Sequence, residues 1–381
     1  MRKYLIIFIV VTAALLAFGW YKIDKLPVTN TQSFSADAAE AGNTAFNELA
    51  KARVTEVKSK DVEQSQHLSQ ITETLQATFL DGSEKGQSVE VDYNDTLTDL
   101  KIQEVKVGDI IVVGKIATPD QTSYVLVDRY RLPYLGWIAA AFLILAIIFG
   151  RLRGLTSVIG LLAGIGILLW FIVPNILAGK NPTLVTLVGA GAIALVSMFL
   201  AHGFKPRTMV AVIGTLFTLG LAQAMAYFFV LGARLLGNGS EQAYFIQAGY
   251  FGAINLQGLL LGGIIIGTLG ILNDITTAQA ATVEEIKKAD DKLTFRQLYH
   301  KASSVGREHI ASLINTLVLT YAGASLPLFL LFTVSHTQLW AVLNSSTIAE
   351  EIVRTLVGSM ALILAVPITT CLAAWYFKLE P

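Results

Sequence analysis

The chain has 381 residues, of which 54% are hydrophobic and 15% charged, and its mean hydropathy of +0.59 is too high for an ordinary soluble domain. The net charge is zero, but residues 21–134 hold 18 acidic and 12 basic residues, which argues against a nucleic-acid partner for that stretch. The single cysteine, Cys371, excludes an intrachain disulfide.

The chain starts with a basic residue pair and an apolar run that ends at Trp20. A cleaved signal peptide would have the same basic start and apolar middle, followed by small residues such as those at 17–19. The run is close to spanning length and ends in Trp20 and Tyr21, which suit a membrane interface. We therefore expect residues 1–20 to be an uncleaved membrane anchor. Residues 21–47 are largely small and polar and are predicted to be a tether.

Five short β-like segments follow within residues 48–131. The expected strands are 52–57, 71–79, 88–93, 109–116 and 123–127, separated by turn signals such as Asp81-Gly82 and Lys85-Gly86. Five short strands with this punctuation predict a small β-barrel that is OB-like in outline. The stretch lacks the basic, aromatic-lined groove of single-strand binders, so a structural or protein-contact module is favoured over a nucleic-acid site.

Seven further apolar runs predict membrane spans within residues 135–378. They lie near 135–150, 154–173, 183–201, 208–233, 253–273, 311–334 and 352–377. With the anchor they make eight spans, so the predicted fold is an α-helical polytopic membrane protein with a small β-domain after the first span.

The placement of Lys and Arg predicts the topology. With the N-terminus in the cytoplasm, inside segments hold thirteen Lys/Arg, and the short outside loops hold only Lys180, Arg234 and Arg354. Both termini are therefore expected to be cytoplasmic, with residues 21–134 outside. Residues 274–308 are expected to form a cytoplasmic connection in which 278–288 is a helix lying against the membrane.

Small residues line one predicted helix face ahead of this connection. Gly263, Gly267, Gly270 and Asp274 fall at i, i+4, i+7 and i+11, a spacing that places them on one side of a helix. Glycines at such positions let two helix backbones approach closely, so this is predicted to be a helix-packing face.

The span after the connection carries a polar stripe. Its members are Glu308, Ser312, Asn315, Thr316 and Thr320. Because an unpaired polar group in hydrocarbon costs several kcal/mol, we expect this stripe and the glycine face to meet, which makes the two helices neighbours.

These polar residues are the candidate site, and each has two interpretations. Asp274, with Asn273, is either a proton or cation site or a solvated helix end that caps the next segment. Asn315, Thr316 and Thr320 either line a polar pathway or form interhelical hydrogen bonds. Glu308 is either part of the pathway or an interfacial partner of Arg307.

No soluble-enzyme chemistry is recognisable. The five histidines form no ligand set, and the glycine clusters lie inside apolar spans rather than in a nucleotide-binding loop. We therefore expect no metal, no cofactor and no enzymatic activity.

The motifs from Gly267 to Ile286 and from Gly306 to Leu328 together resemble the YibE/F family of bacterial multi-span membrane proteins. The likeness extends to the β-module with its Val107-Gly108-Asp109 turn. The sequence departs from the family pattern at Asn273 and at the pair Glu308-His309. The resemblance implies an architecture and a bacterial plasma membrane location, but no activity. Asn273, Asp274, Glu285 and Thr316 are also similar in pattern to the proton-driven accessory subunits of protein export.

Three functions follow as hypotheses. The first is a transporter or channel, in which Asp274 and the polar stripe face a shared path. The second is a membrane scaffold or accessory subunit that recruits an envelope protein through its β-domain. The third, a membrane enzyme acting on lipid or envelope precursors, ranks last. The expected partners are the lipid bilayer, a second copy or related subunit joined through the glycine faces, and an envelope protein.

Overall fold

The computed structural model describes residues 48–64, 69–97, 105–117, 122–248, 254–334 and 337–379. The chain divides between Ile144 and Leu145 into two compact units, a barrel unit and a helical unit. The predicted anchor at 1–20 and tether at 21–47 lie outside the described residues.

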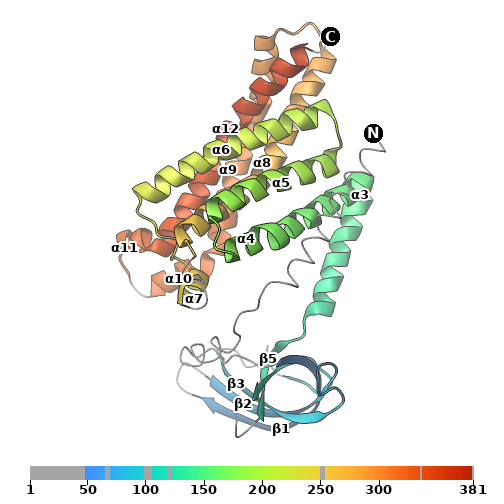
Figure 1. Cartoon of the computed structure of the whole chain (residues 1–381), viewed down its shortest axis with the longest axis vertical. Helices are drawn as coiled ribbons and strands as arrows, with labels where there is room; N and C mark the ends of the chain where they lie inside the picture. Colours follow the sequence, from blue (N-terminus) through green and yellow to red (C-terminus); the bar gives the residue numbers. More distant parts are fainter. Residues whose placement is uncertain are drawn as a thin grey trace. The chain divides into compact units, whose positions relative to one another are not determined.

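The barrel unit contains the five strands that the sequence predicted (Figure 1). They are β1 (Glu48–Gln64), β2 (Ser69–Phe79), β3 (Ser88–Leu97), β4 (Ile110–Ala117) and β5 (Thr122–Arg129). Their order is β1-β2-β3-β5-β4, and β1 also pairs with β4, which closes the barrel. The expected small five-stranded barrel is thus confirmed.

Strand β1 is far longer than predicted because it pairs with two neighbours. Its first part pairs with β4 and most of its length pairs with β2. The pairing between β1 and β2 is interrupted by register shifts between Val54 and Glu56 and between Val57 and Ser59. Irregularities of this kind bend a strand and increase its twist, which allows one strand to join both edges of the barrel.

Alternation along the strands builds the interior of the barrel. On β2 the side chains of Leu75, Ala77 and Phe79 are buried, while the residues between them are partly exposed. On β4 Ile111 and Val113 point the same way. A period of two places each set on one face of the sheet, and closure turns that face into a core.

The helical unit begins within α3 and ends with α12. The helices are α3 (Leu132–Ile167), the π-helix η1 (Leu168–Ile172), α4 (Val173–Leu177), α5 (Pro182–His202), α6 (Pro206–Gly232), α7 (Glu241–Ala248), α8 (Leu256–Ala289), α9 (Phe295–Ala324), α10 (Leu326–Val334), α11 (Leu339–Asn344) and α12 (Ser346–Leu379). Among the described residues five helices are long and apolar enough to cross a membrane, or six if the bent pair α9–α10 counts as one span.

The first candidate span runs from Leu132 to Leu177 and combines two runs that the sequence separated. It is kinked at Arg151, which has a φ of 51° and a ψ of −140°. A Cβ atom at Gly154 would lie 2.0 Å from the carbonyl oxygen of Ala146, so the chain folds back tightly here. The bend divides the span into two segments that match the predicted runs at 135–150 and 154–173.

Most of the predicted connection at 274–308 is helical. Helix α8 continues to Ala289, and α9 starts at Phe295 with a capping box between Thr294 and Gln297. Only residues 290–294 link them. Residues 278–288 are the continuation of α8 rather than a separate surface helix. Glu284 pairs with Lys288 at 3.0 Å, an i,i+4 contact that supports the helix here.

The predicted span at 311–334 also needs correction. Helix α9 begins sixteen residues earlier, at Phe295, and the chain bends by 57° between α9 and α10. Pro327 lies in the first turn of α10, where its missing N–H and its ring prevent α9 from continuing straight. The break therefore has a local cause that the sequence already contained.

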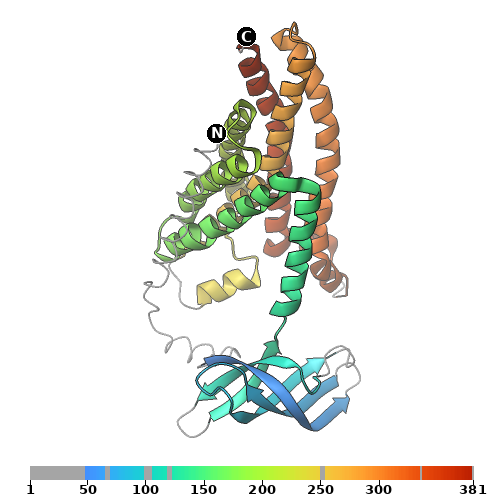
Figure 2. The same ribbon diagram turned by 90° about the vertical axis from the view of Figure 1, so that its right-hand side faces the viewer.

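Helices α6, α8 and α12 form the centre of the helical unit. Leu219 of α6, Ile264 and Leu272 of α8 and Leu362 of α12 are fully buried there. The turn between α8 and α9 lies at one end of the unit, and α7, α10 and α11 lie at the other (Figures 1 and 2). The two ends of α8 are therefore in different surroundings.

Candidate functional site

A cluster of buried polar side chains lies where α6, α8, α9 and α12 meet. The hydroxyls of Thr215 and Thr276 are 2.7 Å apart. The side-chain amide of Gln279 donates to the Ala302 carbonyl at 3.0 Å and to the Thr370 hydroxyl at 2.7 Å. Thr215, Thr276, Gln279 and Thr370 are all fully buried. We call these four residues the polar cluster.

Local sequence explains how the polar cluster is assembled. Thr276 and Gln279 are three residues apart on α8, so they share a helix face. Glycines on neighbouring helices make room for polar side chains: a Cβ at Gly214 would lie 2.6 Å from Thr369 Oγ1, and one at Gly306 would lie 3.0 Å from Gln279 Oε1. Within the described chain, Gln279 Oε1 and Thr369 Oγ1 have no hydrogen-bond partner, so acceptor capacity is left at the cluster.

Asp274 and Asn273 lie next to this cluster on α8 but face other groups. Asn273 donates from Nδ2 to the Ser197 hydroxyl of α5 at 3.2 Å. Asp274 is exposed, and it interacts electrostatically with His202 at the end of α5. The interpretation of Asp274 as a helix cap is wrong, because α8 runs through this position without a break.

The predicted glycine packing face is mostly open. Gly263 and Gly270 are exposed, and a Cβ at Gly270 would meet nothing within 4 Å. Gly267 alone of the three contacts the next helix, since its Cβ would lie 3.0 Å from the hydroxyl of Tyr321. The tightly packed glycine is instead Gly262, where a Cβ would lie 2.7 Å from Thr186 Oγ1. Helix α8 therefore packs through the face that contains Gly262, which is rotated by about 100° around the helix axis from the predicted face.

Helices α8 and α9 are neighbours, as the sequence predicted, but not through the expected faces. The residues of the α9 stripe that formed part of the candidate site are all exposed: Glu308, Asn315, Thr316 and Thr320. Thr316 donates to Ser312 O at 3.2 Å and Thr320 donates to Thr316 O at 2.7 Å. A threonine that bonds back to its own helix needs no partner helix, which explains why the stripe does not meet the glycine face. The ion pairs of the described residues do not include Glu308 with Arg307.

A cavity of about 400 Å³ lies at the N-terminal end of α8, away from the polar cluster. Its walls come from η1, α4, α7, α8 and the start of α12. Glu350 is only 6% exposed and accepts a hydrogen bond from the Gly239 N–H at 3.0 Å. Arg354 lies one turn further along α12 and pairs with Glu351 at 3.1 Å. One wall is the π-helical turn η1, a distortion that is frequent at functional sites.

A family model described as YibE/F-like protein matches residues 138–379, well over half of the chain. The chain belongs to the YibE/F-like family. The resemblance found in the sequence is thereby confirmed, although the match does not extend to the barrel. The family region contains the polar cluster, the cavity and every candidate residue of the sequence analysis. No curated protein and no solved structure gives a match to the chain.

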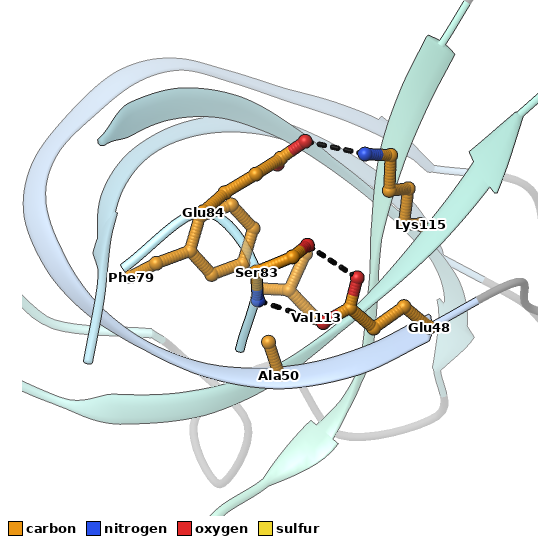
Figure 3. A pocket seen from close by; sticks show the side chains of 7 residues that line it. All are labelled: Glu48, Ala50, Phe79, Ser83, Glu84, Val113 and Lys115. Carbon is orange, nitrogen blue, oxygen red and sulfur yellow. Dashed lines mark hydrogen bonds and ion pairs between the residues drawn. The ribbon is translucent and has the colours of Figure 1, made fainter. Parts of the chain in front are cut away.

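The barrel of this YibE/F-like protein carries a charged network around a hollow of only about 10 Å³ (Figure 3). Glu48 accepts hydrogen bonds from the Ser83 N–H at 2.9 Å and from its hydroxyl at 2.6 Å. Glu84 pairs with Lys115 and accepts from the Tyr124 hydroxyl at 2.8 Å. A space of this size holds one water at most, so the network fixes the β2–β3 turn against β1 and β4 rather than forming a ligand site.

These contacts shift the acidity of the barrel carboxyls. The hydrogen bonds from Ser83 hold the pKa of Glu48 below its usual value, and the pair with Lys115 does the same for the pKa of Glu84. Burial, with the bond to Glu84, raises the pKa of Tyr124. Within the described ranges no group of three or more His, Cys, Asp and Glu could hold a metal ion.

Sequence reasoning missed both helical sites for identifiable reasons. Thr276 and Gln279 follow directly after the Asn273-Asp274 pair, but the sequence pattern predicted that they lie in a connection outside the membrane. Arg354 was assigned to an outer loop, although the spacing of Glu350 and Arg354 at i and i+4 ahead of an apolar run was a usable signal.

Proposed function

We propose that this YibE/F-like protein is a membrane transporter or channel for a small solute or ion. The observation that carries the proposal is the polar cluster, four fully buried polar side chains at the crossing of four helices. Polar groups inside a membrane bundle are expensive, and they commonly mark substrate or ion pathways. Packing alone needs only small residues at such a crossing.

The buried face of α8 supports a path between the two helical sites. Gly262 lines the cavity, and Thr268, Thr276 and Gln279 follow on the buried side of the same helix. The hydroxyl of Thr268 is buried and has no hydrogen-bond partner within the described chain. A solute that leaves the cavity would therefore meet polar groups along α8 before it reaches the polar cluster.

The proposed setting is a bacterial plasma membrane with both termini in the cytoplasm and the barrel outside. The bias of Lys and Arg toward the expected inside segments supports this topology. With that orientation the cavity lies at the outer end of the helical unit, and Asp274 lies near the middle of α8. The expected partners are the bilayer, a second copy or a related subunit, and no nucleic acid.

The test is a proton and cation flux assay in vesicles that contain the full-length protein. Gln279→Leu removes both amide hydrogen bonds of the polar cluster at similar volume, and we expect flux to fall on the order of tenfold or more. Asp274→Asn tests the carboxylate in the middle of α8 in the same assay. Gly270→Ala, at an open position on the same helix, is the matched control and should keep wild-type flux.

Monodisperse extraction checks that each variant is folded. Unchanged flux in Gln279→Leu would remove the cluster from the pathway. Absence of flux from the wild type, over a panel of ions and gradients, would contradict transport altogether.

A second candidate function is a scaffold or accessory subunit. It is favoured by the open faces of α8 and α9, where Gly270, Asp274 and Asn315 are exposed along helices of a membrane protein. Polar faces at membrane depth call for a covering partner. Removal of residues 28–131 should then abolish function while Asp274→Asn is silent, which is the reverse of the outcome expected for a transporter.

A further inference from the structure

We propose that the cavity between α4, α7, α8 and α12 binds the ammonium group of a small amphipathic amine, with Glu350 as its counter-ion. One part of this inference rests on the proposed transport function: it names small amphipathic amines as the class of substrate that is transported. The binding site itself follows from size, lining and charge.

The dimensions and walls of the cavity suit a small organic molecule. Its volume of about 400 Å³ lies within the range of small-molecule sites. Most of the lining is aliphatic, and includes Leu168, Ile172, Ile176, Leu260 and Ile266. Such walls favour the apolar part of an amphipathic solute over a fully hydrated inorganic ion.

The charges at the cavity favour a cation. Arg354 is balanced by Glu351, because Nη1 and Oε1 of the two side chains are 3.1 Å apart. Glu350 forms no ion pair among the described residues and is held by the backbone N–H of Gly239. Glu350 and Arg354 line the cavity and Glu351 does not, so after the Arg354–Glu351 pair is counted the charge that remains at the cavity is the −1 of Glu350. An anion would add to this charge in apolar surroundings, whereas an ammonium group would neutralise it.

Glu350 retains the capacity to accept from a ligand. A carboxylate has about four acceptor positions, and the loop amide uses only some of them. The loop approaches this closely because residue 239 is glycine: a Cβ there would lie 2.8 Å from the Glu350 Cδ. The carboxylate is thus fixed in position before a ligand arrives, which lowers the entropic cost of binding.

The α8 wall of the cavity is kept open by another glycine. Gly263 lines the cavity, and a Cβ at this position would meet only Arg354 Nη2, at 4.0 Å. Because Gly263 has no side chain, a ligand can occupy the space next to it. A larger residue at 263 can therefore obstruct the cavity without disturbing a packed helix interface.

The experiment is a titration of the purified full-length protein with n-butylammonium, using butyrate and 1-butanol as anionic and neutral analogues of similar size. We expect saturable binding of butylammonium and weaker binding of both analogues. Glu350→Gln keeps an acceptor for the Gly239 amide but removes the charge, and it should weaken butylammonium binding at least about tenfold.

Gly263→Leu is the second variant, because it fills the cavity and leaves all charges in place; it should weaken butylammonium binding to a similar degree. Gly270→Ala, outside the cavity, is the control. Butyrate binding as tightly as butylammonium would overturn the proposal, as would full binding by either cavity variant or no saturable binding by the wild type.

The outcome separates this inference from the proposed function. The titration uses no gradient, so butylammonium binding without flux would retain the site and contradict transport. Flux of other ions without butylammonium binding would contradict the amine site alone.

Discussion

At the scale of single residues, glycines on α8 and α9 decide which helix faces pack. Gly262 and Gly306 each lie where a Cβ would come within 3.0 Å of a neighbouring side chain, whereas a Cβ at Gly270 would meet nothing within 4 Å. The spacing of glycines alone does not reveal this difference. Contact with a neighbouring helix, rather than residue type, makes a glycine essential for packing.

The first prediction compares a glycine that packs against a neighbouring helix with a glycine that meets no neighbour. Gly306→Ala should destabilise the helical unit by about 1–3 kcal/mol, because its new methyl group would lie 2.4 Å from the Val366 Cγ1. Gly270→Ala should leave stability unchanged or slightly improved, since alanine favours helix and meets no neighbour. Thermal unfolding in one detergent measures both, and equal loss in the two variants would contradict the packing assignment.

The second prediction is the acid sensitivity of the barrel. Hydrogen bonds or ion pairs hold the pKa values of Glu48, Asp81, Glu84 and Asp128 below their ordinary values. The lowered folded-state pKa means that the stabilisation is present at neutral pH and is lost as pH falls below about 4.5 and through the folded-state values. The unfolding temperature of the barrel should therefore decrease from pH 6 to about pH 3.

Its control is the matched variant Glu84→Gln. Removing this carboxyl should flatten the dependence on pH while the barrel keeps its fold. A barrel of constant stability across this range would show that the charged contacts contribute nothing.

At the scale of elements, the bend in α3 converts one long apolar stretch into two segments. Arg151 takes a positive φ, a region in which residues other than glycine are strained by about 1–3 kcal/mol. Gly154 lies directly against the Ala146 carbonyl, and there no side chain fits. The bend thus depends on a position that tolerates strain and on one that tolerates no Cβ.

The third prediction follows from these two positions. Arg151→Gly should be neutral or stabilise the protein by about 1 kcal/mol, because glycine adopts positive φ without strain. Gly154→Ala should disrupt the bend and reduce the yield of monodisperse protein. Size-exclusion profiles and thermal unfolding measure both variants, and normal behaviour of Gly154→Ala would contradict the geometry of the bend.

At the scale of the whole molecule, the barrel and the helical unit are two separate compact bodies. Each has its own hydrophobic core, with residues such as Leu75 and Ile111 in one and Leu272 and Leu362 in the other. The family match covers the helical unit and excludes the barrel. The helical unit therefore carries the part of the protein that the family shares.

The fourth prediction concerns this division. A chain that lacks residues 28–131 should still give a monodisperse membrane protein whose helical unit unfolds at a temperature close to that of the full chain. Circular dichroism and thermal unfolding measure this. Loss of the folded helical unit on removal of the barrel would show that the two units depend on each other.

Much of the fold could be predicted because its signals are local. Alternation of apolar residues with turn pairs located all five strands, and apolar runs located the long helices. The prediction was incomplete between Asp274 and Glu308, where charged residues were interpreted as a connection with one separate helix at 278–288. Helix formers and the buried Thr276, Gln279 and Val283 keep this stretch helical, and burial on one side is not visible in composition.

The sequence by itself determined the membrane class, the barrel and the family. Only the tertiary structure decided which residues form the sites, because Thr215, Gln279 and Thr370 are far apart in the chain. Hydropathy also fails to orient membrane helices, since side chains facing lipid are as apolar as side chains facing the core. The direction of each helix face is therefore fixed by contacts with neighbouring helices. The polar cluster forms where α6, α8, α9 and α12 meet, and the cavity forms between η1, α4, α7, α8 and α12.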